Sequence, residues 1–474
     1  MLHKEIPVTI GYVPPLAPDF IPFYAFMREY LKAAEKRLAI AVERSGGHIS
    51  VYETHFHGTP DMAETDYKYI ERLARFLMWA RGGFCITLYG DGIEPLAQRL
   101  KKDYSPDGRR MSDANFFATV YEQPFEISWA SYDERPKAKE SPIPSGLHFN
   151  GCRIGFDAGG SDRKVSAVID GETIFSEEVV WHPKLNADPE YHYDGIVSAF
   201  KTAASKMPRV DAIGVSTAGV VINNQIVAAS LFCKIPTPYP EKVKNVYLRA
   251  AQELGDVPIA VANDGDVSAL AGSMSLEQNR VLGIAMGTSE AAGYVDSNGD
   301  FTGWLNELAF APVDLSDQAA YEETVFDIGL GCKYFSQNAV IRLAEKIGIE
   351  LKESDTLAEK LKTVQELMEK GDSRADKVFE SIGCFLGHTT PLYAHMYDIG
   401  HMLILGRVAS GKGGDRIVQV CNEILETEYP DVAASLRVVL PNEQFRRVGQ
   451  SMAAASLPEL MFNEVKTLIN ESGE

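Results

Sequence analysis

Apolar residues recur at two different spacings along this chain, and the two spacings predict a mixed α/β protein. In residues 22–44 and 66–81 they follow the spacing of amphipathic helices, whereas residues 84–89 form a short strand-like run. Asp91 then stands at the position of a cap for a further helix. These patterns predict a separate N-terminal α/β domain, residues 1–145.

The character of the sequence changes after residues 135–150, a polar segment that holds three prolines and predicts a linker. From residue 152 onward, strand-like and helix-like stretches alternate, which is typical of α/β folds. Strand patterns lie at 153–156, 165–169, 211–215, 258–262, 281–286, 291–295 and 402–405. Helical patterns lie at 241–254, 337–370 and 443–473.

A turn rich in glycine joins the first two strands after the linker. Gly159 and Gly160 allow the backbone to approach a ligand closely and leave N–H groups free for a phosphate. Ser161 adds a hydroxyl and Lys164 a cation. Asp157, at the strand end, is placed to orient a hydrated Mg²⁺ ion, which usually keeps several waters in proteins. A simple tight hairpin is the alternative interpretation.

A second turn of this kind, Gly287-Thr288-Ser289, joins two later strands and offers two hydroxyls to an anion. It too has an ordinary hairpin as its alternative. We interpret the pair of turns as two phosphate cradles.

Gly406 and Arg407 begin a third turn, which follows the last predicted strand. Residues 406–413 nearly match the phosphate-loop pattern GxxxxGK[ST], but Gly413 stands where that pattern needs a hydroxyl for Mg²⁺. We therefore predict a turn that supports the base or ribose of a nucleotide.

The dipeptide Asn263-Asp264 follows the apolar run 258–262 and precedes a helix-like stretch. A carboxylate at the carboxyl end of a buried strand is well placed to act as a base toward a ligand. A helix N-cap is the alternative role, because Asn and Asp are both good caps, and Asp266 is the better candidate for it. We predict Asp264 as the catalytic base.

The composition narrows the class of protein. A chain of 474 residues is too long for one compact core, so two or three domains are expected. A net charge of −20 disfavours nucleic acid as a partner. Six scattered cysteines, without CxC or CxxC, predict the reduced thiols of a cytoplasmic protein. No apolar run approaches the ~20 residues of a membrane span, so we expect no membrane partner.

Two histidine pairs do not predict a metal site. His55 and His57 share one face of a strand, but further ligands at clear spacing are missing. His388 and His395 lie seven residues apart in a helical stretch that Pro391 interrupts. We expect core or surface histidines.

Six short motifs follow one another in a recognisable order. They are DAGGS at 157–161, STAG at 216–219, AND at 262–264, GTS at 287–289, NELAFAP at 306–312 and GRV at 406–408. In this order residues 151–460 resemble the ROK family (repressors, open reading frames and sugar kinases) of the sugar kinase, heat-shock protein and actin superfamily.

The resemblance implies an α/β fold of two ribonuclease H-like (actin-like ATPase) halves around a cleft, each with a βββαβα succession. It implies a first half at 151–275, a second half at 276–442 and a C-terminal helix at 443–474 that packs back on the first half. The N-terminal domain is additional. It carries no basic recognition helix like that of a DNA-reading domain.

The resemblance also implies an enzyme that transfers phosphate from ATP, with Mg²⁺, to a hydroxyl of a hexose or amino sugar, and that forms a homodimer. Asp264 is the implied general base. The implied substrate-binding residues are Gly219, Asn263 and Glu307. The implied nucleotide-binding residues are Gly159, Gly160, Ser161, Lys164, Gly287, Thr288, Ser289, Gly406 and Arg407, with Asp157 holding Mg²⁺ through water.

Two departures from the family pattern leave other functions open. Phe310 stands where the family has the His of its ExGH element, and the zinc cluster CxCGxxGCxE is reduced to Gly331-Cys332, so we expect no zinc. The alternative is a non-catalytic regulator that binds a sugar or nucleotide and lacks a DNA-binding domain. A third interpretation is an ATPase that activates a partner enzyme, but the paired cysteines for the iron–sulfur cluster of such activators are missing.

Overall fold

The computed structural model describes residues 6–140 and 142–460, which form two compact units. Unit 1 lies within Met1–Ser145 and Asp264–Gly449, and unit 2 lies within Gly146–Asn263 and Gln450–Glu474. The boundary between the units therefore falls inside the dipeptide Asn263-Asp264. The four domains expected from the sequence stay a prediction.

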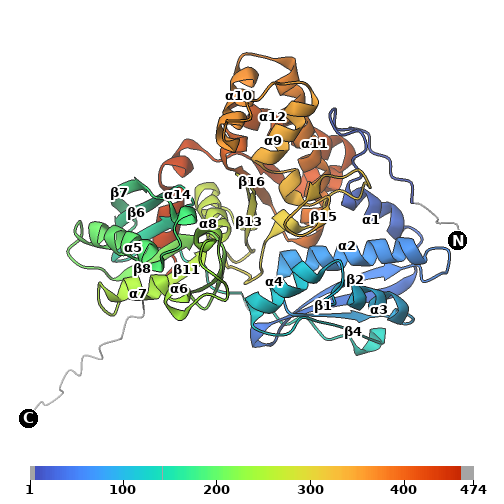
Figure 1. The fold of residues 1–474 in the computed structure, drawn as a ribbon, viewed down its shortest axis with the longest axis horizontal. Helices are drawn as coiled ribbons and strands as arrows, with labels where there is room; N and C mark the ends of the chain where they lie inside the picture. Colours follow the sequence, from blue (N-terminus) through green and yellow to red (C-terminus); the bar gives the residue numbers. More distant parts are fainter. Residues whose placement is uncertain (1–5, 141, 461–474) are drawn as a thin grey trace, which may run out of the picture. The chain divides into compact units, whose positions relative to one another are not determined.

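Unit 2 is built on a five-stranded sheet with the order β11-β8-β5-β6-β7, green to teal in Figure 1. Neighbours among β5, β6 and β7 are antiparallel, whereas β8 and β11 run parallel to β5. The strands are β5 (Cys152–Ala158), β6 (Asp162–Ile169), β7 (Glu172–Val180), β8 (Ala212–Thr217), β11 (Ile259–Asn263) and the small hairpin of β9 (Val220–Ile222) and β10 (Gln225–Ala228). The helices are α5 (Pro189–Ala204), α6 (Glu241–Lys244) and α7 (Val246–Gln252). Three strands followed by α5, β8 and α7 give the expected βββαβα succession.

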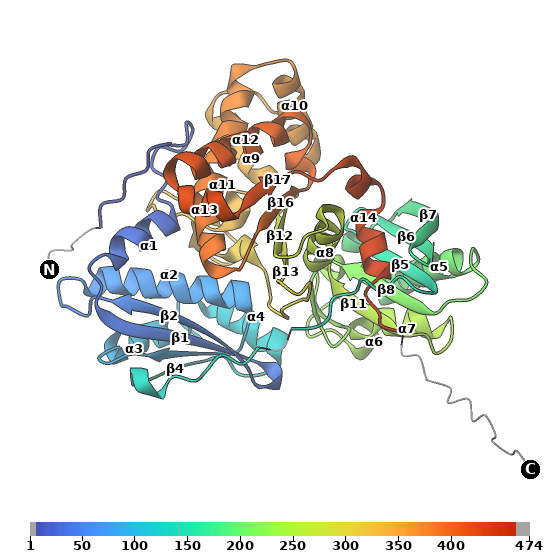
Figure 2. The ribbon, with the colours of Figure 1, turned by 180° about the vertical axis from the view of Figure 1, so that it is seen from behind.

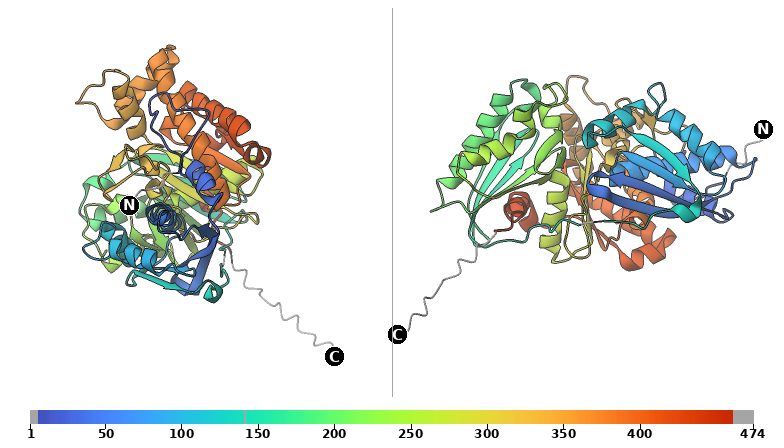
Figure 3. Two further views of the ribbon diagram at one scale, coloured as in Figure 1. Left: turned by 90° about the vertical axis from the view of Figure 1, so that its right-hand side faces the viewer. Right: turned by 90° about the horizontal axis from the view of Figure 1, so that it is seen from below.

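The end of helix α14 (Glu443–Ala455) packs on this sheet, and Figure 3 shows it in red against the green strands. A Cβ atom at Gly214 would lie 1.6 Å from the backbone oxygen of Ala454, and one at Gly155 would lie 1.8 Å from that of Ser451. The close approach of helix and sheet therefore requires glycine in both strands. The helix predicted at 443–473 is confirmed over Glu443–Ala455 and is wrong for residues 456–460, which are not helical; residues 461–474 lie outside the described residues.

Unit 1 contains a second sheet with the order β13-β12-β16-β17. β13 is antiparallel to β12, whereas β16 and β17 are parallel to it. The strands are β12 (Val281–Met286), β13 (Glu290–Val295), β16 (His401–Leu405) and β17 (Arg437–Val439), with the small pair β14 (Tyr321–Glu322) and β15 (Asp327–Ile328). The helices are α8 (Asp264–Leu276), α9 (Gln337–Lys346), α10 (Leu357–Glu369), α11 (Ser373–Met396), α12 (Gly411–Glu428) and α13 (Pro430–Ser435). The helical pattern at 337–370 is thus two helices, because α9 ends before Gly348 and a capping box at Thr356 starts α10.

The N-terminal residues form a third sheet with the order β2-β1-β3-β4. Its strands are β1 (Lys36–Arg44), β2 (His48–Phe56), β3 (Cys85–Tyr89) and β4 (Glu126–Ala130). Its helices are α1 (Phe23–Leu31), α2 (Ala63–Arg81), α3 (Glu94–Asp103) and α4 (Met111–Tyr121). The helical pattern expected over 22–44 is therefore wrong beyond α1, since Leu38 to Val42 form a continuously buried strand segment. Asp91 is not a helix cap, because Ile93 holds that position in α3.

The N-terminal sheet shares a hydrophobic core with the rest of unit 1. Its side chains join those of residues 264–449 in one hydrophobic cluster. Figures 1 and 2 show α2 running between the blue sheet and the orange helices. Phe76 of α2 contacts Tyr393 of α11, with 6.3 Å between ring centroids, and Phe20 contacts Phe385 at 4.9 Å. Because α2 is buried on nearly all sides, residues 1–145 pack as part of unit 1.

No helix among residues 6–140 and 142–460 has the length and apolar character needed to cross a membrane.

Candidate functional site

Asp264 is the first residue of α8 and directly follows β11, so the predicted succession of strand and helix is confirmed. Its Oδ1 accepts a hydrogen bond from the backbone N–H of Gly265 over 3.0 Å. Asp266 is not the helix cap that we expected. Its Oδ1 accepts from the backbone N–H of Tyr294 over 3.2 Å and from Nδ2 of Asn306 over 3.0 Å. Asp266 thereby ties the first turn of α8 to β13 and to the loop that follows β13.

Glu307 interacts with both of these carboxyl groups in unit 1. Burial, together with the charges of Asp264 and Asp266, raises the pKa of Glu307 to about 7. Burial likewise raises the pKa of Asp266 to about 7, and the charge of Asp264 adds to that rise. The predicted base and the predicted sugar ligand Glu307 are thus brought together in a cluster that holds protons near neutral pH.

Glu290 is a fourth carboxyl group of this cluster, and the sequence analysis missed it. It is the first residue of β13 and is 4% exposed. Burial raises the pKa of Glu290 to about 8, and the charge of Glu307 adds to the effect. Its Oε2 has no hydrogen-bond partner within residues 6–140 and 142–460. A glutamate at a buried strand position was the only signal that could have singled it out.

The second and third glycine turns lie beside each other in unit 1, because β12 and β16 are parallel neighbours and each turn follows one of them. Gly406 has a φ of +88°, and a Cβ atom there would lie 2.5 Å from the backbone oxygen of Met286. The backbone N–H of Gly287 donates to the oxygen of Ser289 over 2.9 Å, so it is used inside the turn. Thr288, Ser289, Gly406 and Arg407 are exposed.

In unit 2, the carboxyl ends of three neighbouring strands bring together Asp157, Ser216, Gly219 and Asn263. The hydroxyl of Ser216 donates to Oδ1 of Asp157 over 2.8 Å. Nδ2 of Asn263 donates to the backbone oxygen of Gly219 over 2.8 Å. The predicted sugar-binding pair Asn263 and Gly219 is therefore joined by a direct hydrogen bond.

The first glycine turn, between β5 and β6, makes internal contacts. The indole N–H of Trp181 donates to the oxygen of Gly159 over 2.7 Å, and Ser161 Oγ donates to Asp162 Oδ2 over 2.8 Å. Nζ of Lys164 lies 3.1 Å from Oε2 of Glu178 on the adjacent strand. The structure thus pairs this predicted phosphate-binding lysine with a carboxylate, and Lys164 must leave Glu178 to reach a phosphate.

Comparison with known proteins gives no match by sequence: no family model matches the chain, and neither does any curated protein. The fold does match. The chain is similar to a ROK hexokinase from Thermus thermophilus, with 16% sequence identity, a TM-score of 0.50 and coverage of 65% of this chain and 97% of that one. It is also similar to a ROK family transcriptional regulator, described as a homolog of the E. coli MLC protein, with 16% identity, a TM-score of 0.51 and coverage of 65% of this chain and 79% of that one.

This chain has the ROK fold. The resemblance predicted from the six motifs is thereby confirmed at the level of fold. At 16% identity the likeness extends to fold alone, and about a third of the chain lies outside each comparison. The activity and the residue roles remain proposals.

Within this ROK fold, no group of three or more His, Cys, Asp or Glu residues in the described part of the chain could hold a metal ion. The single carboxylate Asp157 fits a Mg²⁺ ion that keeps most of its waters. Cys332, the remnant of the zinc motif, donates from Sγ to Glu322 Oε2 over 3.5 Å. His57 and His388 make interior contacts: the His57 ring lies 3.1 Å from the backbone oxygen of Tyr30, and His388 is fully buried.

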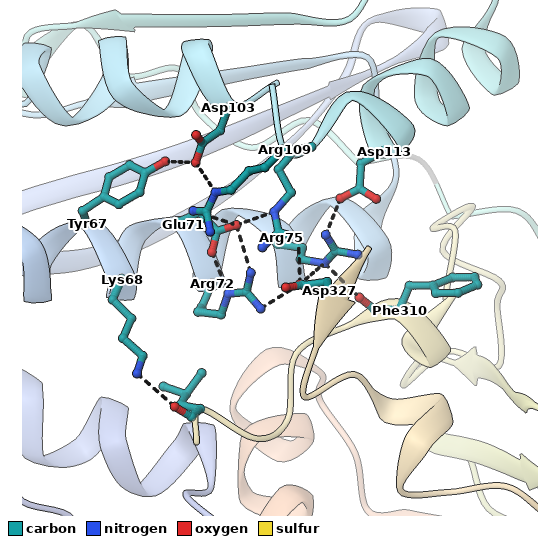
Figure 4. Close-up of polar contacts among 12 residues, drawn as sticks. Tyr67, Lys68, Glu71, Arg72, Arg75, Asp103, Arg109, Asp113, Phe310 and Asp327 are labelled. Carbon is teal, nitrogen blue, oxygen red and sulfur yellow. Dashed lines mark hydrogen bonds and ion pairs between the residues drawn. The ribbon is translucent and has the colours of Figure 1, made fainter. Parts of the chain in front are cut away.

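Helix α2 also carries a buried ionic network that no pattern in the sequence predicts (Figure 4). Oδ2 of Asp327 lies 2.8 Å from Nη1 of Arg72, 2.9 Å from Nη1 of Arg110 and 3.3 Å from Nε of Arg75. Glu71 pairs with Arg72 at 2.6 Å and with Arg110 at 2.7 Å. The network joins α2 to β15 and pairs several of the charged residues buried inside unit 1.

A cavity of about 640 Å³ opens beside this network. Side chains of both signs line it, among them Lys68, Arg99, Arg109, Glu64 and Asp317. Because both signs are present, its charge selects neither a simple anion nor a simple cation.

Proposed function

We propose that this protein is an ATP-dependent kinase that phosphorylates a hydroxyl of a hexose or amino sugar, with Asp264 as the general base. The observation that carries the proposal is the charge interaction between Asp264, the first residue of α8, and the buried carboxyl group of Glu307 in the loop after β13. The same unit holds the exposed turns at Gly287 and Gly406. Phosphoryl transfer to a sugar needs a base, a group that binds the neighbouring sugar hydroxyls, and turns that can hold the nucleotide.

In the proposed reaction, the carboxylate of Asp264 accepts the proton of the sugar hydroxyl. The hydroxyl oxygen forms a bond to the γ-phosphorus of ATP while the bond from that phosphorus to the bridging oxygen of the β-phosphate breaks, and ADP leaves. A sugar hydroxyl is a weak acid, so the base helps mainly as the transition state develops. Positioning and charge neutralisation supply most of the catalysis.

In unit 1, Glu307 holds sugar hydroxyls, and its pKa of about 7 lets it act as donor or acceptor near neutral pH. In unit 2, Asn263 and Gly219 are the proposed sugar contacts. The proposed phosphate and nucleotide contacts are Gly159, Gly160, Ser161, Lys164, Thr288, Ser289, Gly406 and Arg407, whereas the N–H of Gly287 is occupied by its own turn.

ATP is proposed to act with Mg²⁺, which neutralises phosphate charge. Asp157 would hold the hydrated ion, and the hydroxyl of Ser216, at 2.8 Å, orients its carboxylate. No zinc is assigned. A homodimer remains a prediction.

Release of ADP tests the proposal, measured with a panel of hexoses and amino sugars at fixed ATP and Mg²⁺. We expect one sugar class to raise the rate of ADP release well above the rate without sugar. Absence of sugar-dependent release across the panel, with ATP binding intact, would reject the kinase.

One observation favours a second function, a non-catalytic regulator that binds a sugar or nucleotide. Phe310 replaces the expected histidine. Its ring packs on Trp79 with 4.7 Å between centroids, and its backbone oxygen accepts from Nε of Arg75 over 3.3 Å. Isothermal titration of ATP and of each sugar, beside the ADP assay, separates the two functions: binding without turnover favours the regulator.

A further inference from the structure

The loop that carries Glu307 is fastened to the C-terminal end of α2. The backbone N–H groups of residues 305, 306 and 307 donate to the backbone oxygens of Arg81, Ala80 and Trp79, over 3.1, 3.0 and 3.0 Å. The last carbonyl groups of a helix have no partner within the helix, so the loop satisfies three of them. The main chain at Glu307 is thereby set by a helix of the N-terminal segment.

Asn306 turns its side chain inward at this point. Its φ is +54°, a left-handed conformation that asparagine tolerates better than most residues, and it is 3% exposed. Nδ2 of Asn306 donates to Oδ1 of Asp266 over 3.0 Å, and its Oδ1 accepts from the hydroxyl of Tyr397 over 3.1 Å. One residue therefore bonds α2 through its backbone and α8 through its amide.

The partner Tyr397 is itself held by the end of α2. The guanidinium carbon of Arg81 lies 4.8 Å from the centroid of the Tyr397 ring and 3.3 Å from that of Trp304. A guanidinium over aromatic faces is attractive, more so when it is shielded from water, as Arg81 is. Helix α2 thus contacts Asn306 directly through the backbone and indirectly through Arg81 and the Tyr397 ring.

We propose that Asn306 is a positioning residue that fastens the first turn of α8, with the proposed base Asp264, to α2 of the N-terminal segment. The proposal rests on the kinase function above. It gives residues 1–145 a role: their helix α2 holds the loop of Glu307 and, through Asn306, the start of α8. The sequence marked Asn306 only as the first residue of a motif.

Two variants test it. Asn306→Gly keeps the left-handed backbone and removes the amide, whereas Asn306→Asp keeps the size and replaces the donor by an oxygen that faces Asp266. Asn223→Gly is the matched control, because Asn223 also has a positive φ, +52°, but is exposed and lies in unit 2. Each full-length variant is compared with the parent in sugar-dependent turnover and in affinity for ATP.

A second readout is independent of turnover. Aspartate labelled with ¹³C at the side-chain carboxyl reports the titration of Asp266, with its signal assigned by Asp266→Asn. Burial and the charge of Asp264 raise the pKa of Asp266, whereas the hydrogen bonds from the backbone N–H of Tyr294 and from the amide of Asn306 lower it. Loss of the bond should therefore move this titration to higher pH.

We expect both Asn306 variants to titrate Asp266 at higher pH than the parent. We also expect their kcat to fall about 10- to 100-fold, with the ATP dissociation constant unchanged. Asn223→Gly should match the parent in every readout. An unmoved Asp266 titration, or an unchanged kcat in both variants, would overturn the positioning role. If the parent protein transfers no phosphate but the Asp266 titration still moves in the variants, the kinase function is overturned. The positioning of the first turn of α8 by Asn306 then still holds.

Discussion

The hydroxyl of Tyr393 on α11 lies 3.4 Å from Oε1 of Glu290 on β13 and donates to it inside unit 1. This hydrogen bond favours the ionised carboxylate, yet burial and the charge of Glu307 outweigh it and raise the pKa of Glu290 to about 8. Glu290 therefore holds its proton at neutral pH. The same opposition of burial and hydrogen bonding acts at Asp266.

The substitution Glu290→Gln should change how stability depends on pH. The native state keeps the Glu290 proton up to about pH 8, whereas the unfolded chain loses it above its ordinary pKa of 4.5. Between these values the free energy of unfolding should fall by about 1.4 kcal/mol per pH unit for this one group. Glutamine removes that contribution, so urea unfolding from pH 5 to 8 should show a flatter pH dependence in the variant.

Glu345→Gln on α9 is the matched control, since Glu345 is exposed. It should leave the slope of the parent protein unchanged. Parallel curves for Glu290→Gln and the parent would show that Glu290 is ionised in the native state.

Gly406→Ala should damage the third turn more than its backbone conformation alone explains. The added Cβ would lie 2.5 to 2.8 Å from backbone atoms of Met286, and the φ of +88° adds strain. Gly348→Ala, with a φ of +80° and no atom within 4 Å, carries the strain without the clash. We expect Gly348→Ala to cost about 1 kcal/mol and Gly406→Ala clearly more in urea unfolding, with weaker ATP binding only for Gly406→Ala. Equal losses in the two variants would contradict the close approach to Met286.

Asp327→Asn should destabilise unit 1 strongly, because three arginines lie within 3.3 Å of one oxygen of Asp327. Removing one member of a buried ionic network leaves uncompensated charge and costs about 3–5 kcal/mol. Asp317→Asn is the control, since its side chain is 93% exposed and 3.8 Å from Lys68, and should cost less than about 0.5 kcal/mol. Urea unfolding at neutral pH gives both free energies of unfolding. A similarly small loss of stability in the two variants would show that solvent neutralises the charge of the arginines without Asp327.

The sequence could predict those parts of the site that local patterns encode. The strand and helix around Asp264, and the turns at Gly287 and Gly406, are marked by an apolar run followed at once by glycine or a polar residue. These features depend on residues close together in the chain, so their positions agree with the structure.

The rest depends on contacts between distant residues. Arg72 and its partner Asp327 are 255 positions apart, and no local spacing links them. The amphipathic pattern at 66–81 predicts a helix with one polar face, whereas the structure buries α2 on nearly all sides and pairs its charged residues in the interior. The spacing of apolar residues over 22–44 predicts a helix, yet Leu38 to Val42 form a buried strand segment, and a fully buried strand is apolar without alternation. Asn306 and Glu290 gained their roles only when β13, α2 and α8 were brought together.

Exchange of Asp264 for asparagine tests the central claim most directly. The measurement is the kcat for transfer of ³²P from the γ-phosphate of ATP to the sugar, in the parent, in Asp264→Asn and in the exposed control Asp256→Asn. A general base contributes about 10²- to 10⁴-fold, so Asp264→Asn should lose at least about 100-fold in kcat, while its melting temperature and ATP affinity stay at the parent values. Asp256→Asn should match the parent. Turnover in Asp264→Asn equal to that of the parent would contradict the assignment of Asp264 as the base.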